Sequence, residues 1–235
     1  MVSDLESFLP MASAIGRAID LLHENKEKIR PFGINDLWLV RDCPRKAWYK
    51  MQSSRAITNY SQLKRIGNIN NEIKRNVKTD LFGIGLTVKN QGKEVIALDP
   101  ETGLMISGRA DGILDNLEAL NMGSKDHLLS ISSCGERNEF TSLKEKGFEH
   151  WHLKHRIQVS IIAHLLKLTR IIVIVESRND SQRYYERVKI DKILARRTLE
   201  RCFTIMKMSC APEKRKCQSC HQWEVKCCEY REECW

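Results

Sequence analysis

The sequence predicts an α/β fold in which a mixed β-sheet is flanked by helices and followed by a cysteine-rich carboxy-terminal tail. Short runs rich in β-branched and apolar residues, separated by Gly, Pro and Asn, occupy residues 86–133. Helical periodicities precede and follow these runs, and strands with helices on both sides in sequence are typical of an α/β sandwich. Five of the nine cysteines fall within residues 217–235.

Composition limits the classes of protein that this chain can represent. Its 235 residues suffice for one packed domain with a small appendage. Lys and Arg outnumber Asp and Glu by 39 to 30, and this net charge of +9 favours a polyanionic partner, most simply nucleic acid, with an anionic membrane surface as the lesser alternative. The most apolar run, Ile171 to Val175, is too short to span a membrane, and the acidic amino terminus is not a basic secretory leader. We therefore expect an intracellular protein.

The first part of the chain is expected to be helical. We expect an amino-terminal helical segment over residues 1–34, a core over 35–209 and a tail over 210–235. Apolar residues at helical spacing predict a helix from Met11 to Ile29. Asp36 is expected to cap a short helix and Pro44 to open the next one, which places Cys43 at a helix junction. A further helix is predicted over residues 66–78.

Strands dominate the middle of the core, and helices return after them. Four strands are predicted over residues 86–90, 94–99, 104–115 and 127–133. A helix over 149–168 should precede a buried strand over 171–177, with residues 183–190 as its neighbour on the edge side. The last predicted element is an amphipathic helix that begins near Asp191.

Two neighbouring strand segments carry the residues most informative about function: GRADGILD at 108–115 and HLLSISS at 127–133. Metal-dependent phosphodiester cleavage needs carboxylates that hold Mg²⁺ or Mn²⁺ and a cation that stabilises the developing phosphate charge. A strand with Glu-x-Lys supplies both on one face, because alternate residues of a strand point the same way. Here Asp111 is present, but the second strand carries Ser130 and Ser132.

The order of motifs resembles that of RecB-type nucleases of the PD-(D/E)XK superfamily, especially the iron-sulfur branch associated with CRISPR adaptation. The resemblance covers residues 35–228 and implies a restriction-endonuclease-like core. It rests on six segments in order: CPRKAWY at 43–49, GNINNE at 67–72, GRADGIL at 108–114, HLLSISS at 127–133, HRIQVSIIAHLL at 155–166, and KCQSC at 216–220 with the later cysteines. It implies that Asp111 matches the metal-binding aspartate and Gln158 the glutamine of a helix beside the active site.

The departures from the family pattern fall on three positions of the implied catalytic site. Asn71 stands where the family has histidine, Ser130 where it has glutamate and Ser132 where it has lysine. A neutral hydroxyl is a poor ligand for a hard divalent ion and carries no charge to stabilise the transition state. We therefore expect that catalytic Mg²⁺ or Mn²⁺ is lost and that the chain is not an efficient nuclease. The alternative is an active site in which the missing carboxylate is supplied from another position, by Glu136 or Glu139. The three substitutions themselves would have arisen by evolutionary drift or as an engineered knockout.

The cysteines predict a metal or cluster site, because an odd number of them without a secretory signal argues against a disulfide framework. The resemblance implies a [4Fe-4S] cluster on Cys43, Cys217, Cys220 and Cys228, with Cys227 as an alternative ligand. Zinc on the same thiolates, or unligated thiols, are the alternatives. Three other cysteines are expected to pack as small apolar residues and not to bind metal: Cys134, Cys202 and Cys210.

The leading functional hypothesis is a non-catalytic protein that binds DNA without sequence preference. Inactivated relatives of this nuclease family serve as nucleocapsid proteins of archaeal viruses, and the chain is similar to them. This implies coating or packaging of DNA, self-association along it, and a place in the host cytoplasm and the virion. The alternatives are a CRISPR-associated or repair exonuclease with rearranged ligands and an inactive subunit of a nuclease or integrase complex. Basic residues grouped in sequence are the candidate DNA contacts: Arg41, Arg45, Lys46, Lys64, Arg65, Lys154, Arg156, Arg196 and Arg197.

Overall fold

A five-stranded mixed sheet forms the centre of the protein. The computed structural model describes residues 32–52, 60–120, 125–213, 228 and 230, without the side chains of 60–64 and 119–120. The sheet has the order β1-β4-β5-β6-β7. Its strands are β1 (Thr87–Lys89), β4 (Gly112–Asp115), β5 (His127–Cys134), β6 (Arg170–Ser177) and β7 (Arg183–Lys189). Only β5 and β6 pair in parallel, so the predicted mixed sheet is confirmed, as is the edge position of residues 183–189.

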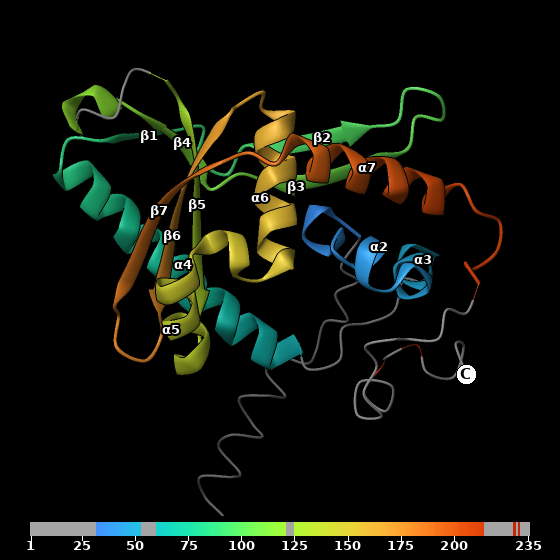
Figure 1. Cartoon of the computed structure of the whole chain (residues 1–235), viewed down its shortest axis with the longest axis horizontal. Coiled ribbons are helices and arrows are strands. Elements are labelled where there is room, and N and C mark those ends of the chain that lie inside the picture. The colour runs from blue at the N-terminus through green and yellow to red at the C-terminus, as the bar shows by residue number, and fades with distance from the viewer. Residues whose placement is uncertain (1–31, 53–59, 121–124, 214–227, 229, 231–235) are drawn as a thin grey trace, which may run out of the picture.

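Helices cover both faces of this sheet (Figure 1). The long helix α4 lies on one face, and α6 lies on the other with α7 packed against it. The α-helices are α2 (Leu39–Asp42), α3 (Pro44–Gln52), α4 (Tyr60–Gly83), α5 (Arg137–Lys146), α6 (Leu153–Leu165) and α7 (Lys192–Met206). The short 3-10 helices are η1 (Ile34–Asp36), η2 (Leu117–Leu120) and η3 (Phe148–His150).

The core is divided into two clusters by the sheet. Along β6, Val173 and Val175 join the cluster under α6, whereas Ile174 joins the cluster under α4. This division follows from the alternation of side chains along a strand. Burial of both faces also explains why the sequence of β6 is a continuous apolar run. Each face therefore needs its own helix, and α4 supplies Ile73 and Val77 for one of them.

A separate antiparallel hairpin, β2 (Glu94–Leu98) with β3 (Met105–Arg109), extends from the central sheet (Figure 1). The sequence predicted one strand over residues 104–115, but the chain leaves the hairpin at Ala110 and enters the central sheet at Gly112. A Cβ atom at Gly112 would lie 2.3 Å from Val88 Cγ1, so glycine permits the close contact between β4 and β1 at this crossing. Asp111 is therefore placed between the two sheets.

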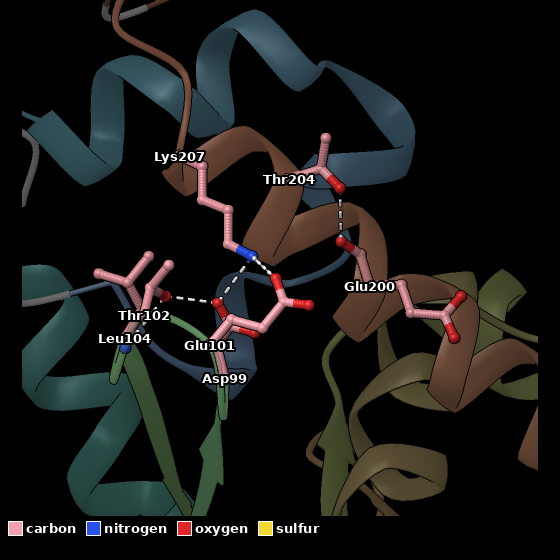
Figure 2. Close-up of polar contacts among 7 residues, drawn as sticks. All are labelled: Asp99, Glu101, Thr102, Leu104, Glu200, Thr204 and Lys207. Carbon is pink, nitrogen blue, oxygen red and sulfur yellow. Dashed lines mark hydrogen bonds and ion pairs between the residues drawn. The ribbon is translucent and has the colours of Figure 1, made fainter.

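The turn of the hairpin is tied to the end of α7 (Figure 2). The Lys207 ammonium lies 2.9 Å from Asp99 Oδ2 and 3.2 Å from Glu101 Oε2. The Thr102 hydroxyl donates to the same Asp99 carboxylate, and the bond from Lys207 is the largest of the interactions that lower the pKa of Asp99 below its usual range. These contacts fix the outer end of the hairpin relative to the helical layer.

Several sequence-based boundaries were wrong. Asp36 does not cap α2, since its carboxylate accepts hydrogen bonds from the Gly33 amide and from Lys50. The helix predicted from residue 149 begins at Leu153, after η3. The helix α5 was not predicted at all. By contrast, α7 begins next to Asp191 as expected. The Asp191 carboxylate caps the helix, accepting a hydrogen bond from Leu194 N at 2.8 Å. The helix predicted over residues 11–29 lies outside the described residues.

Candidate functional site

Asp111 is held by two contacts at the point where the hairpin meets the central sheet. Its Oδ2 atom accepts a hydrogen bond from the Ile131 amide at 2.8 Å. Its Oδ1 atom forms an ion pair with the Lys74 ammonium of α4 at 2.5 Å. The side chain of Asp111 is only 18% exposed, and that of Lys74 is 35% exposed. Both carboxylate oxygens are therefore engaged by groups of the protein.

Ser130 lies beside this aspartate on the neighbouring strand. In the β4–β5 ladder Gly112 pairs with Leu129, so the next position in the same register sets Asp111 beside Ser130. Ser132 follows on the same face of β5, and both serines are half-buried. Asp111 and Ser130 are thus neighbours on adjacent strands, as expected from the motif.

The side of α4 that faces the site carries two lysines and an asparagine. Asn71, Lys74 and Lys78 recur at helical spacing and share one groove with Asp111. Burial lowers the pKa of Lys78, while the Asp111 carboxylate acts in the opposite direction and the nearby Lys74 charge lowers it further. The adjacent Asn70 accepts a hydrogen bond from the Ser133 hydroxyl at 2.5 Å, which fixes α4 to the end of β5.

The groove around Asp111 has a volume of about 950 Å³. Its walls come from four parts of the chain: the face of α4 just described, the hairpin, the segment leading into η1, and α6. The hairpin wall combines charged and apolar residues, namely Glu94, Ile96, Met105, Ser107 and Arg109. Gln158 of α6 lines the groove as well, so the structure brings Asn71, Asp111 and Gln158 together. A space of this size accommodates part of a nucleotide chain.

The donor set at Asp111 does not fit a Mg²⁺ or Mn²⁺ ion. Such ions bind several oxygen ligands, usually with carboxylates among them. Here the Lys74 ammonium occupies one side of the Asp111 carboxylate, and Ser130 contributes a neutral oxygen. Over the described parts of the chain, no three His, Cys, Asp or Glu side chains are grouped so that they could hold a metal ion.

The two displaced carboxylates considered above do not line this groove. Glu136 is exposed at the start of α5. Glu139 accepts a hydrogen bond from the Cys134 thiol at 3.3 Å, and its other oxygen lies 3.2 Å from His152 Nε2. Its contacts are thus made at the far end of β5, beyond both serines, rather than at Asp111.

The described cysteines divide into three environments. Cys43 is half-buried between α2 and α3 as predicted, and its sulfur accepts a hydrogen bond from the Lys46 amide at 3.4 Å. Cys134 and Cys202 are buried, and burial raises the pKa of Cys202 to about 12. Cys210 is exposed, so its assignment to apolar packing was wrong. Two of the predicted cluster ligands, Cys217 and Cys220, lie outside the described residues, as does the alternative ligand Cys227.

The described residues of the tail contact α3, the helix that begins after Cys43. Tyr230 is buried and stacks on Tyr49 with ring centroids 5.7 Å apart. Upstream of it, the Pro212 carbonyl accepts from the Arg45 guanidinium at 2.9 Å. The predicted ligand Cys228 is half-buried two residues before Tyr230. The cluster and its ligand set remain a prediction.

The basic residues proposed as DNA contacts are spread over several surfaces. None of those with described side chains lines the Asp111 groove. Some make internal contacts: Arg45 bonds Pro212, Lys154 lies 5.9 Å from the Trp38 ring centroid, and Arg196 pairs with Glu200 at 3.6 Å. Of the others, Arg41, Arg65 and Arg197 are exposed, Lys46 and Arg156 are half-buried, and the Lys64 side chain lies outside the described part.

Sequence reasoning missed Lys74, Lys78 and Arg109 as site residues, although the spacing of the two lysines from Asn71 on one helix could have indicated them.

The fold is that of restriction-endonuclease-like nucleases, with a mixed central sheet flanked by helices. Comparison with family models and with curated proteins finds no match. Among solved structures, the chain is similar to SSO0001, with a TM-score of 0.51 and 17% identity over 96% of both chains. It is also similar to an alkaline exonuclease (LHK-Exo) from Laribacter hongkongensis, with a TM-score of 0.51 and 11% identity over 75% of this chain and 86% of that one. The same exonuclease in complex with dAMP matches with a TM-score of 0.50 and 10% identity, over the same shares of the two chains. At sequence identities this low, the similarity to these structures shows a shared fold and nothing about function.

Proposed function

We propose that this protein binds DNA on a nuclease scaffold without cleaving it efficiently. The proposal rests on the surroundings of Asp111. Its carboxylate forms an ion pair with Lys74, and its neighbour on the adjacent strand is Ser130 rather than a second carboxylate. Hydrolysis of a phosphodiester on this scaffold needs a metal ion and a positioned water molecule. Loss of several groups that act together lowers such a rate by orders of magnitude.

Two further observations support DNA as the partner. The chain has a net charge of +9, which favours a polyanion. One neighbour with this fold, LHK-Exo, has been crystallised in complex with dAMP, a nucleotide. Basic side chains on surfaces away from the groove, such as the exposed Arg41 and Arg197, suit a protein that covers DNA over a length rather than reading one site.

A protein of this kind is suited to coating or packaging DNA, as the nucleocapsid hypothesis requires. Binding should then be independent of sequence, weaken steeply with salt, and saturate along the DNA. In this role the protein would self-associate on DNA and be found in the host cytoplasm and the virion. The second candidate is a metal-dependent exonuclease with rearranged ligands, which the likeness to LHK-Exo favours.

The two candidates differ in a nuclease assay. The purified full chain is incubated with end-labelled single-stranded and duplex DNA in EDTA or in Mn²⁺, and the products are resolved on a denaturing gel. We expect intact DNA in both conditions, together with binding in a gel-shift assay at low salt. Mn²⁺-dependent degradation that disappears in Asp111→Ala would refute the non-catalytic proposal and establish the exonuclease.

A further inference from the structure

The Asp111 groove contains cations at the place where the resemblance implies a metal site. Asp111 is the carboxylate of the site, and the cation beside it is the ammonium of Lys74, 2.5 Å from Oδ1. Lys78 follows on α4 and has no ion pair with any residue whose side chain is described. Arg109 lines the opposite wall, where Glu94 is its partner in the hairpin ladder. The groove thus holds three cations and two anions.

The spacing of these cations suits the phosphates of a nucleic-acid strand. Side chains at positions i and i+4 of a helix are neighbours on its surface, so Lys74 and Lys78 present adjacent ammonium groups to the same space. Lys78 is partly desolvated: burial lowers its pKa most, the Asp111 carboxylate raises it, and the Lys74 charge lowers it. A bound phosphate would add a further negative charge beside Lys74 and Lys78, and nearby negative charge favours the protonated form of a lysine.

The opposite wall of the groove has a different chemistry. Ile96 and Met105 line it and are 51% and 63% exposed, so they offer apolar surface facing the lysines of α4. A nucleic-acid strand has the same division, with charged phosphates on one side and the flat apolar faces of sugars and bases on the other. The hairpin is held in place at its outer end by Lys207, which keeps this wall opposite α4.

We propose that Lys74 has taken the place of the catalytic metal ion, so that the groove binds DNA phosphates through Lys74 and Lys78 without any divalent cation. The inference rests on the proposed function and adds the site, the ligand group and the role of Asp111. With no DNA bound, Asp111 neutralises Lys74. When DNA enters, a phosphate displaces the carboxylate from the ammonium, so Asp111 acts as a competing internal anion. Phosphate is then bound by ion pairs alone, with no covalent step.

The test uses fluorescence anisotropy of a labelled oligonucleotide, single-stranded and duplex, with the full-length protein at fixed ionic strength. Affinity in EDTA should equal affinity in Mg²⁺. Lys74→Gln or Lys78→Gln should weaken binding about tenfold and reduce the slope of log affinity against log salt by about 1. Lys74→Arg should retain binding, because it keeps the charge. Lys146→Gln is the matched control, since it removes an exposed lysine outside the groove.

The most distinctive expectation concerns the aspartate. Asp111→Asn preserves an acceptor for the Ile131 amide but removes the competing charge, so it should tighten DNA binding by about two- to fivefold. Asp115→Asn makes the same change of net charge at the ion pair with Lys89, outside the groove, and should tighten binding less. Circular dichroism confirms that each variant is folded before affinities are compared.

The outcomes separate this inference from the proposed function. Absence of DNA binding by the unaltered protein would refute both. If DNA binds but requires Mg²⁺, or if Lys74→Gln and Lys78→Gln bind as well as Lys146→Gln, the groove inference is wrong while the DNA-binding proposal stands. Weaker binding by Asp111→Asn would show that Asp111 assists the ligand rather than competing with it, and would also overturn the inference.

Discussion

His155 is a half-buried side chain that we expect to make the stability of this protein depend on pH. Its ring stacks on Trp151 with centroids 4.7 Å apart and planes 5° apart. Burial lowers the pKa of His155 to about 4, and the positive charges of Lys154 and His152 contribute in the same direction. The neutral ring is therefore the form that the folded protein stabilises at neutral pH.

This pKa shift predicts a loss of stability in mildly acidic solution. Between pH 6.5 and about 4 the unfolded chain binds a proton at this histidine and the folded chain does not, so the free energy of unfolding falls as pH is lowered. The full effect is roughly 3 kcal/mol below the folded pKa. His155→Phe should flatten the dependence of Tm on pH in this window. His150→Gln, at an exposed position, should leave it unchanged.

The slope that remains in His155→Phe should come from His127, whose pKa is also lowered by burial and, to a lesser degree, by the charges of Arg170 and Arg187. His127 Nδ1 lies 2.7 Å from the Lys125 carbonyl. If His127→Phe abolished the dependence of Tm on pH while His155→Phe left it unchanged, His155 would not be the residue responsible for the acid-induced loss of stability.

Lys74 illustrates at the same scale why the site was only partly predictable from sequence. The motif order located Asp111 and Ser130 as neighbours, because strand register follows from the alternation of residues. The ion pair between Lys74 and Asp111 joins residues far apart in the chain. It depends on how α4 crosses the sheet, which local periodicity does not determine. The sequence therefore located Asp111 and Ser130 side by side but did not indicate that Lys74 pairs with the aspartate.

Among the elements, the β2–β3 hairpin depends on contacts outside its own two strands. An isolated two-stranded hairpin is only marginally stable in water. Here its inner face is buried through Val95 and Ala97, and its turn is tied to α7 through Lys207. The ion pair raises the pKa of Lys207 and lowers that of Asp99. The contact is therefore complete at neutral pH, when both groups are charged.

Removing this tie should loosen the hairpin selectively. In Lys207→Met we expect faster hydrogen exchange of the amides of residues 94–109 at pH 7, with little change in α4 and β5. Because the pKa of Asp99 is lowered by the contact, the stabilisation is present above the ordinary aspartate pKa and is lost as pH falls through the folded value. The variant and the unaltered protein should therefore converge in acid. Lys192→Met, on the first turn of the same helix, is the control, and an equal effect of both substitutions would refute the tie.

Helix α5 is the element that sequence reasoning missed, and the reason is its short apolar pattern. Only Phe140 and Leu143 of α5 are buried, so one turn of periodicity distinguishes it from a polar connection. The division of residues 104–115 between two sheets was also missed. The strand-like pattern continues through Ala110 and Asp111, so nothing in the sequence marks the end of β3 and the start of β4. Long periodic elements such as α4 and α7, and the apolar run of β6, were predicted correctly because many residues contribute to each signal.

At the scale of the whole molecule, the tail is expected to bind a cofactor that joins distant parts of the chain. The described contact between Tyr230 and Tyr49 already brings the tail to the helix after Cys43. A [4Fe-4S] cluster on Cys43, Cys217, Cys220 and Cys228 would connect the same two regions. Closing so long a loop stabilises a folded chain by restricting the unfolded one.

The cofactor proposal is tested on protein purified without oxygen. We expect absorbance at about 400 nm that dithionite bleaches, with four iron atoms per chain. Cys43→Ser and Cys217→Ser should abolish this absorbance and lower Tm, whereas Cys210→Ser, at an exposed position, should retain both. A colourless protein with stoichiometric zinc would identify the alternative ligand set of zinc thiolates. Colourless, metal-free protein with unchanged Tm in Cys43→Ser would refute both.

Among the described strands, β5 and β6 form the one parallel pair, and this pairing affects how the groove can be assembled during folding. Residues 135–169 separate the two strands, and the parallel arrangement requires this connection to cross from one end of the sheet to the other. The strands β4 and β5, with α4 and Asp111, are all complete before that crossover begins. The wall that carries Gln158 belongs to the crossover itself. We therefore expect the charged floor of the groove to form before its enclosure, which depends on the longer-range pairing of β5 with β6.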